Sequence, residues 1–182
     1  DQTLDYFKRV LVIKEEVGDK AGYGRVLNNI GAIYDTKGEL DQALDYFNRS
    51  LAISEELGYT GNIRNILNMI GNIHFQKSEY DQALDYYTRS LKINEGLGEE
   101  PKLYLITNLY LANKHLGKEY DIQEIYKLIG EADEIDYGLN FRLYELLEDK
   151  SYLEIAYTQL MKQVDEMEDS YKQEFLDYPI PR

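Results

Sequence analysis

Apolar residues recur at steps of three and four along most of the chain, which is the spacing of one face of an α-helix. Segment 24–40 carries Val26, Leu27, Ile30, Ile33 and Tyr34 at these steps, and segment 41–58 carries Ala43, Leu44, Phe47 and Leu51. The polar sequences Lys37-Gly38-Glu39 and Lys77-Ser78-Glu79 interrupt the pattern, as short turns do. The two-residue alternation of a β-strand is not the pattern here, so the predicted fold class is all-α.

The helical pattern is repeated along the chain at a fixed offset. Residues 1–18 match residues 41–58 at 12 of 18 positions, and residues 41–58 match residues 81–98 at 13 of 18. The intervening segments 24–40 and 64–80 align as well. A fixed period of this length indicates stacked helix pairs, because one pair cannot bury its apolar face without a neighbour.

Small residues occupy the positions at which the two helices of each pair are expected to cross. They are Gly31, Gly71, Ala43 and Ala83. A larger side chain there would hold the two backbones apart, so we assign these residues a structural role.

These residues carry a resemblance to the tetratricopeptide repeat, whose signature is a Leu-Gly…Tyr helix followed by an Ala…Phe helix. One unit has Ile30-Gly31…Tyr34 and Ala43…Phe47, and the next has Ile70-Gly71…His74 and Ala83…Tyr87. The tryptophan of the signature is replaced by leucine and the terminal proline is missing. The period of 40 exceeds the usual value of about 34 and resembles the long-helix variant found in signalling scaffolds such as kinesin light chains. The resemblance implies a right-handed α-solenoid of antiparallel helix pairs.

The repeat predicts how the chain is organised. Residues 1–18 are expected to be the second helix of a truncated repeat, followed by full units at 19–58 and 59–98. Residues 99–136 are expected to form a degenerate unit, and residues 137–182 a degenerate helix pair with a capping helix at about 167–176 and a tail. Because the first unit lacks its first helix, we expect the chain to be a fragment of a larger protein. The tail, residues 170–182, resembles the closing stretch of helical-repeat regions in large prokaryotic regulatory proteins.

Charge and composition exclude several classes of function. The net charge is −14, with 15 acidic and 11 basic side chains in residues 1–98 and 19 acidic and 9 basic in residues 99–182. A field of this sign repels phosphate groups, so nucleic acid and anionic membranes are not expected partners. There is no cysteine, and no apolar run approaches the roughly 20 residues that span a bilayer. The segment 1–5 has no signal-peptide character, and we expect the protein to be cytoplasmic.

Catalytic chemistry has few candidate residues. The two histidines, His74 and His115, lie far apart and in no metal-binding motif. His74 stands where the family has a packing tyrosine and is interpreted as a core residue. No nucleophile elbow, phosphate loop or calcium loop occurs. We therefore predict a protein without enzymatic activity, cofactor or metal.

Asparagines recur on the first helix of successive units. Asn28, Asn68 and Asn108 are separated by one full period each, and the same face is expected to carry Arg25, Asn29, Asn65 and Asn72. In tetratricopeptide proteins the first helices line a concave groove, so the resemblance implies that these asparagines hold the backbone of an extended peptide. A carboxamide suits this task because it both donates and accepts hydrogen bonds. The alternative is that they link adjacent units to one another.

Cationic side chains near this face are the remaining candidates. Arg64, Lys114 and His115, with Arg25, would receive an acidic peptide or a terminal carboxylate. The alternative is that each is a solvated surface charge.

The predicted function is therefore that of an interaction scaffold, which binds a peptide or helix of a partner protein within a larger signalling or regulatory protein. The alternative is a homo-oligomerisation module. Without a preceding helix, Leu4, Phe7, Val10 and Leu11 are expected to be exposed, and such an apolar patch favours a dimer.

Overall fold

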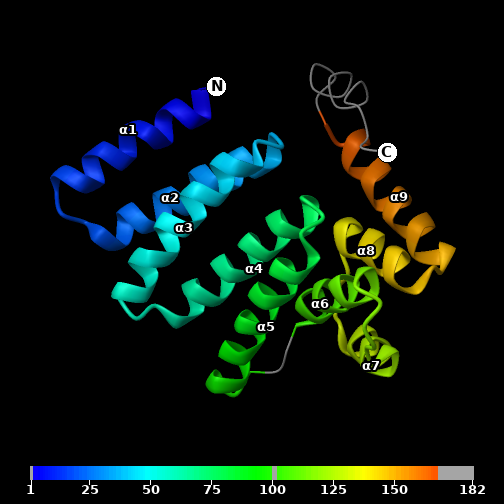
Figure 1. Cartoon of the computed structure of the whole chain (residues 1–182). Helices are drawn as coiled ribbons and strands as arrows, with labels where there is room; N and C mark the ends of the chain where they lie inside the picture. Colours follow the sequence, from blue (N-terminus) through cyan, green and yellow to red (C-terminus); the bar gives the residue numbers. More distant parts are fainter. Residues whose placement is uncertain (1, 100–101, 168–182) are drawn as a thin grey trace. The chain divides into compact units, whose positions relative to one another are not determined.

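The computed structural model describes residues 2–99 and 102–167, and within them it contains α-helices and no strand (Figure 1). The helices are α1 (Gln2–Glu16), α2 (Lys20–Thr36), α3 (Leu40–Glu56), α4 (Thr60–Gln76), α5 (Tyr80–Leu97), α6 (Leu103–His115), α7 (Ile122–Glu131), α8 (Tyr137–Leu147) and α9 (Lys150–Asp165). The predicted all-α class is confirmed. The tail resemblance at 170–182 falls outside the described residues, as does the capping helix beyond residue 167.

The chain forms two compact units, residues 1–120 and residues 121–182. In the first unit each helix packs against the next along the chain from α1 to α6, and α4 also packs against α6. Neighbouring helices therefore form the antiparallel stack of an α-solenoid. In the second unit α8 packs against α9.

The helices of the first unit are followed at regular intervals by residues in the left-handed conformation. These residues are Gly18, Gly38, Gly58, Ser78, Gly98 and Gly117, with φ between 60° and 73°. Glycine adopts this conformation without a steric penalty, which explains all of these choices except Ser78. Because α2 and α4 begin one period apart, as do α3 and α5, the predicted period is present in the coordinates.

Two aromatic rings fill the crossings between paired helices. A Cβ atom built on Gly31 would lie 2.8 Å from the ring of Phe47, and one built on Gly71 would lie 2.6 Å from the ring of Tyr87. Both rings are buried, and Ala43 and Ala83 beside them are fully buried. The predicted structural role of these small residues is confirmed.

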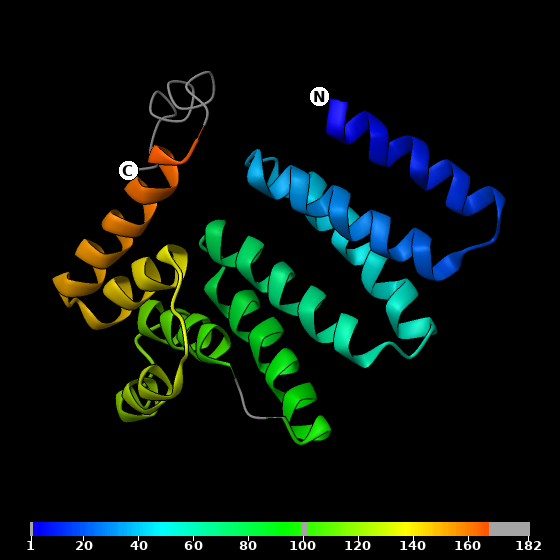
Figure 2. The same cartoon turned by 180° about the vertical axis from the view of Figure 1, so that it is seen from behind.

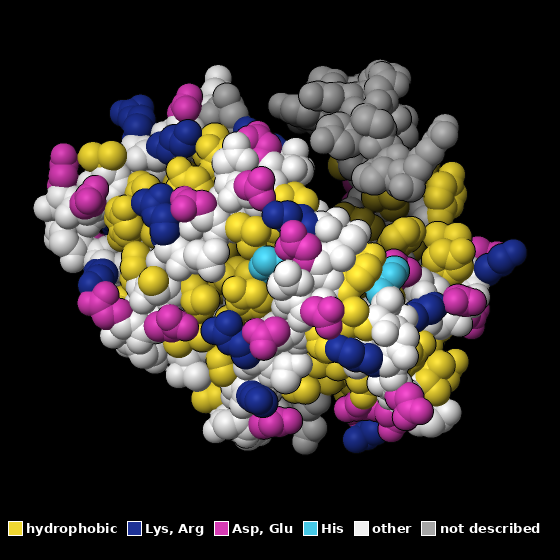
Figure 3. All heavy atoms as spheres, viewed as in Figure 1, with side chains coloured by type: hydrophobic (Ala, Val, Ile, Leu, Met, Phe, Trp, Pro, Cys, Tyr) yellow, Lys and Arg dark blue, Asp and Glu magenta, His cyan; other side chains and the backbone are white. Residues whose placement is uncertain are grey.

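Equivalent polar contacts recur one repeat apart. The Ser50 hydroxyl donates to the Gly24 carbonyl at 2.8 Å, and the buried Ser90 hydroxyl donates to the Arg64 carbonyl at 3.0 Å. On the surface, the Lys77 ammonium lies 2.9 Å from Asp41. Figure 3 shows basic and acidic side chains interspersed over the face in view. Buried hydroxyl–carbonyl bonds therefore tie the two helices of each pair together, while the exposed ion pairs contribute little to stability.

The second unit has a small core of its own. Leu143 and Leu146 of α8 are buried, as are Ala156 and Val164 of α9. The buried Asn140 amide donates to Gln159 Oε1 at 3.0 Å, which joins the two helices.

Helix α1 corrects one expectation from the sequence. Its residues Leu4, Phe7, Val10 and Leu11, predicted to be exposed, pack instead against the apolar face of α2. Figure 2 shows α1 lying along α2 at one side of the first unit. The exposed apolar side chains of α1 are Tyr6 at 64%, Val12 at 52% and Ile13 at 53%, and Val17 in the turn after α1 is 68% exposed. The apolar residues of α1 that face α2 were therefore wrongly predicted to be exposed.

The close crossing at Gly71 predicts a stability difference between two alanine substitutions in α4. We expect Gly71→Ala to destabilise the protein by about 1–3 kcal/mol, because the new methyl group overpacks the Tyr87 ring. Gly61→Ala is the control, since a Cβ there meets nothing within 4 Å; it should be neutral or stabilising by up to about 1 kcal/mol. Urea unfolding followed by circular dichroism measures both. Equal midpoints would contradict the proposed packing.

Candidate functional site

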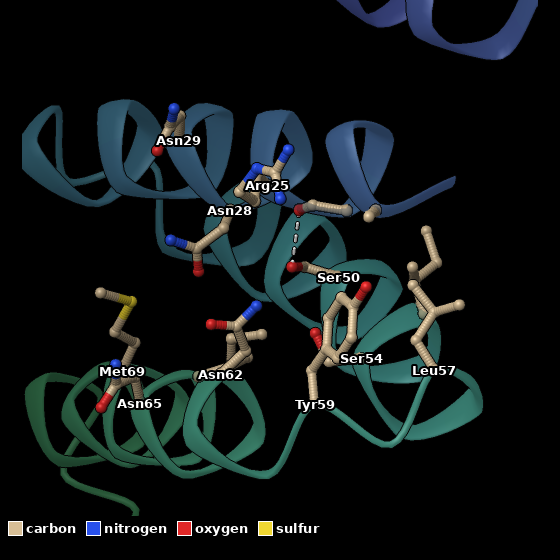
Figure 4. A pocket seen from close by; sticks show the side chains of 14 residues that line it. Arg25, Asn28, Asn29, Ser50, Ser54, Leu57, Tyr59, Asn62, Asn65 and Met69 are labelled. Carbon is tan, nitrogen blue, oxygen red and sulfur yellow. Dashed lines mark hydrogen bonds between the residues drawn. The ribbon is translucent and has the colours of Figure 1, made fainter. Parts of the chain in front are cut away.

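A cavity of about 260 Å³ lies between α2, α3 and α4 (Figure 4). We call it the α2–α4 pocket. Its floor is made by the side chains of α3 and its rims by α2 and α4. The polar side chains that line it are Arg25, Asn28, Asn29, Ser50, Ser54, Tyr59, Asn62 and Asn65. All but Arg25 are uncharged, so the pocket suits a polar ligand rather than a metal ion.

Four of the sequence-predicted groove residues line this pocket: Arg25, Asn28, Asn29 and Asn65. In Figure 4, Asn28 of α2 and Asn62 of α4 point toward one another across the pocket, whereas Asn29 points away from α4. The first helices of two successive repeats thus present carboxamides to the same opening.

The side-chain oxygen of Asn28 is a hydrogen-bond acceptor without a donor. Its Oδ1 atom is buried and has no partner, and it is the one such side-chain atom in the part of the chain that the structure describes. Leaving a buried acceptor unpaired costs about 1–3 kcal/mol. A donor from water or from a ligand in the α2–α4 pocket would remove that cost.

The other three predicted asparagines serve the protein itself. The Asn108 amide of α6 donates to Asn72 Oδ1 at 3.0 Å and makes a longer contact of 3.5 Å to Asn68 Oδ1. The Tyr87 hydroxyl donates to the same Asn72 oxygen at 2.9 Å. Asn108 is only 3% exposed. In this structure Asn68, Asn72 and Asn108 take part in contacts that link α4, α5 and α6.

Arg64 also binds within the protein. Its guanidinium donates to Asn94 Oδ1 at 2.9 Å and forms an ion pair with Glu99. The side chain is 14% exposed, so it lies mostly within the fold. Burial raises the pKa of the neighbouring Tyr104 hydroxyl, and the positive charge of Arg64 opposes that rise.

Lys114 and His115 lie at the end of α6 and do not line the α2–α4 pocket. The His115 ring stacks on Tyr80 with centroids 4.3 Å apart, and its edge meets Phe75. The four predicted cations therefore do not converge on one acidic-peptide site.

His74 has the role predicted for it. Its ring stacks on Tyr86 at 5.2 Å, as Tyr34 stacks on Tyr46 at 5.4 Å one repeat earlier. Its Nδ1 atom lies 2.6 Å from Glu79 Oε2, and this hydrogen bond holds the pKa of Glu79 below its usual range.

The described residues also bear on whether the chain holds a metal site or a membrane span. Within residues 2–99 and 102–167, no group of three potential metal ligands comes together. Within the same residues, no helix is both long and apolar enough to cross a bilayer.

Reasoning from the sequence missed Asn62, Ser54 and Tyr59 as parts of the site. Asn62 is not repeated, because residue 102 is lysine, so the search for recurring asparagines overlooked it. The sequence nevertheless indicated that the two repeats differ near this site, because Gly24 occupies the position that Arg64 occupies in the next repeat.

Comparison with protein families agrees with the repeat. The family model described as tetratricopeptide repeat matches residues 1–56, and a second model of the same description matches residues 65–97. This chain contains tetratricopeptide repeats. Repeats of this family act as non-catalytic interaction scaffolds. No curated protein matches the chain in sequence.

Solved structures share the fold of this chain. The crystal structure of BtubC (BKLC) from P. vanneervenii matches with a TM-score of 0.64 and 17% identity, covering 97% of this chain and 74% of that one. A Podosopora anserina protein assigned as a kinesin light chain, with nearly identical TPR-like repeats, matches with a TM-score of 0.57 and 12% identity, covering 92% and 89%. At these identities the likeness shows the solenoid fold alone.

The amide network predicts which asparagines of α4 matter for stability. Asn72→Ala removes the oxygen to which Tyr87 and Asn108 both donate, and we expect a loss of about 1–3 kcal/mol in unfolding free energy. Asn65→Ala, at an exposed position of the same helix, should change it by less than about 0.5 kcal/mol. Urea titrations of both variants measure the difference. Similar losses would show that the network does not stabilise the stack.

Proposed function

We propose that the first unit is a protein-interaction scaffold that holds an extended peptide of a partner protein along α2 and α4, within a larger signalling or regulatory protein. The observation that carries this proposal is the polar opening between these helices, with a buried and unpaired Asn28 oxygen at its wall.

Carboxamides suit the recognition of a peptide backbone. Asn28, Asn62 and Asn65 each offer an N–H donor and a carbonyl acceptor at the α2–α4 pocket. A peptide unit needs one of each, whatever its own side chain. Asn62 and Asn65 are exposed, so a peptide reaches them without a rearrangement of the helices.

The charge of the site favours no strongly charged partner. Arg25 is the one cationic residue among those lining the pocket, and no carboxylate lines it. Arg64, which was expected to attract an acidic peptide, is already paired with Glu99. The partner segment is therefore expected to bind mainly through its backbone and neutral side chains.

Selection of peptides from a random display library against the whole chain tests the proposal. We expect the selected peptides to bind the double variant Asn62→Ala with Asn65→Ala at least about tenfold more weakly, because two hydrogen bonds are worth about 1–3 kcal/mol together. Fluorescence anisotropy measures the affinities. Asn48→Ala, an exposed asparagine of α3 that does not line the pocket, is the matched control. The proposal would be contradicted if the control weakened peptide binding as much as the double variant does, or if the double variant left the affinity unchanged.

Self-association is a second candidate, favoured by the outer face of α1. Tyr6 and Ile13 are each more than half exposed and are seven residues apart, so they share one side of α1. Val17, in the turn that follows the helix, is also more than half exposed. Contiguous exposed apolar side chains of this kind are typical of interfaces between proteins.

Light scattering across a concentration series tests this second candidate. We expect the mass to rise toward that of a dimer, and Ile13→Glu with Val17→Glu to abolish the rise because charges are costly to bury in an apolar interface. Tyr157→Glu, at an exposed aromatic position of α9, is the control and should leave the rise intact. A monomeric mass at every concentration would exclude self-association.

A further inference from the structure

Two equivalent spaces lie between successive repeats. The first interval lies between α2, α3 and α4, and the second interval lies between α4, α5 and α6. Their main chains are held alike, but their side chains differ. Gly24 of α2 corresponds to Arg64 of α4, one period later in the sequence. The carbonyl groups of both residues accept a hydrogen bond from the equivalent serine, at 2.8 Å from Ser50 and at 3.0 Å from Ser90. The main chain is therefore held in the same way at both places, and the side chain makes the difference.

In the second interval the protein fills this space with its own side chain. The Arg64 guanidinium reaches Asn94 of α5 and Glu99 beyond it. In the first interval Gly24 has no side chain and lines the α2–α4 pocket, and a Cβ built on it would lie 3.0 Å from the side chain of Ile53. The residues equivalent to Asn94 and Glu99 are Ser54 and Tyr59, and both line that pocket.

This exchange changes the chemistry that the pocket accepts. Without a counterpart of Glu99, no carboxylate in the lining would balance a bound cation, and Arg25 would repel one. An anion would place another acceptor against the buried Asn28 oxygen, which needs a donor. A neutral group with both a donor and an acceptor meets both conditions.

We propose that the α2–α4 pocket receives the carboxamide of a glutamine or asparagine side chain of the bound peptide. The inference rests on the proposed function, since the side chain is delivered by a peptide lying along α2 and α4. Two carboxamides pair whichever way the Asn28 amide is turned, and Asn62 faces Asn28 from the other rim (Figure 4).

The size of the pocket agrees with a single side chain. Its volume is about 260 Å³, below the range of roughly 300–1,000 Å³ that is typical of small-molecule sites. The bound side chain would take the place that Arg64 takes in the second interval.

The sequences of library-selected peptides test this inference directly. We expect glutamine or asparagine at one position at least tenfold above its frequency in the unselected library. Replacing that residue by Ala, Glu or Arg should weaken binding to the natural chain at least fivefold, as measured by fluorescence anisotropy.

A variant that copies the second interval links the preference to the pocket. Gly24→Arg combined with Ser54→Asn and Tyr59→Glu should fill the pocket, so that replacing the carboxamide by Ala changes affinity less than twofold. Gly61→Arg is the control for the added arginine, because it places the same side chain on α4 at an exposed position outside the pocket, and it should keep the full effect. If the triple variant loses its helical circular dichroism, Asn28→Asp replaces it: an anionic acceptor should shift the preference from glutamine to lysine or arginine.

The outcomes separate this inference from the function on which it rests. Selected peptides that bind at Asn62 and Asn65 but show no carboxamide preference would overturn the inference alone. The same holds if the Ala replacement weakens binding equally in the natural and the pocket-filled chain. A library that yields no binding peptide would overturn the proposed function and this inference together.

Discussion

The close crossing of paired helices over a single aromatic ring is the constraint on which the first unit depends. At Gly31 and Gly71 the backbone lies so near the rings of Phe47 and Tyr87 that no side chain fits between them. A short distance between paired helices lets each pair present one continuous apolar face to the next. The serine–carbonyl bonds join the two helices within each pair. The pocket and the bond from Asn108 to Asn72 lie at the interfaces between successive pairs.

The aromatic residue at the crossing also determines which polar contacts follow. Tyr87 carries a hydroxyl that donates to Asn72, and Asn72 accepts from Asn108. One repeat earlier, phenylalanine replaces the tyrosine at position 47 and Ala32 replaces the asparagine. The polar groups of Tyr87 and Asn72 therefore have no counterpart in the first interval, where the Asn28 oxygen is unpaired. In the second interval these groups bond to one another and to Asn108, whereas in the first interval the Asn28 oxygen is left for a ligand or water.

The period of the sequence was enough to predict the helices of the first unit and the small residues at their crossings, since both follow from local spacing and side-chain size. Contacts between helices were harder to predict. The sequence shows that Asn28, Asn68 and Asn108 are equivalent, but their partners depend on the following repeat, whose distance and rotation are tertiary properties. For the same reason the apolar stripe of α1 was assigned to solvent when it packs on α2. The substitution of Gly24 by Arg64 one repeat later was visible in the sequence, yet its meaning required knowing that both positions face the same kind of interval.

Equivalent positions in a repeat protein therefore need not share a function. Every unit inherits the same backbone geometry, so each interval offers similar space between first helices. In the second interval the long side chain of Arg64 occupies that space, where it donates to Asn94 and pairs with Glu99. In the first interval glycine takes that position and lines the α2–α4 pocket. If this pocket binds a carboxamide as proposed, a repeat array acquires selectivity through the loss of one side chain and its counter-charge, without a new helix in the walls.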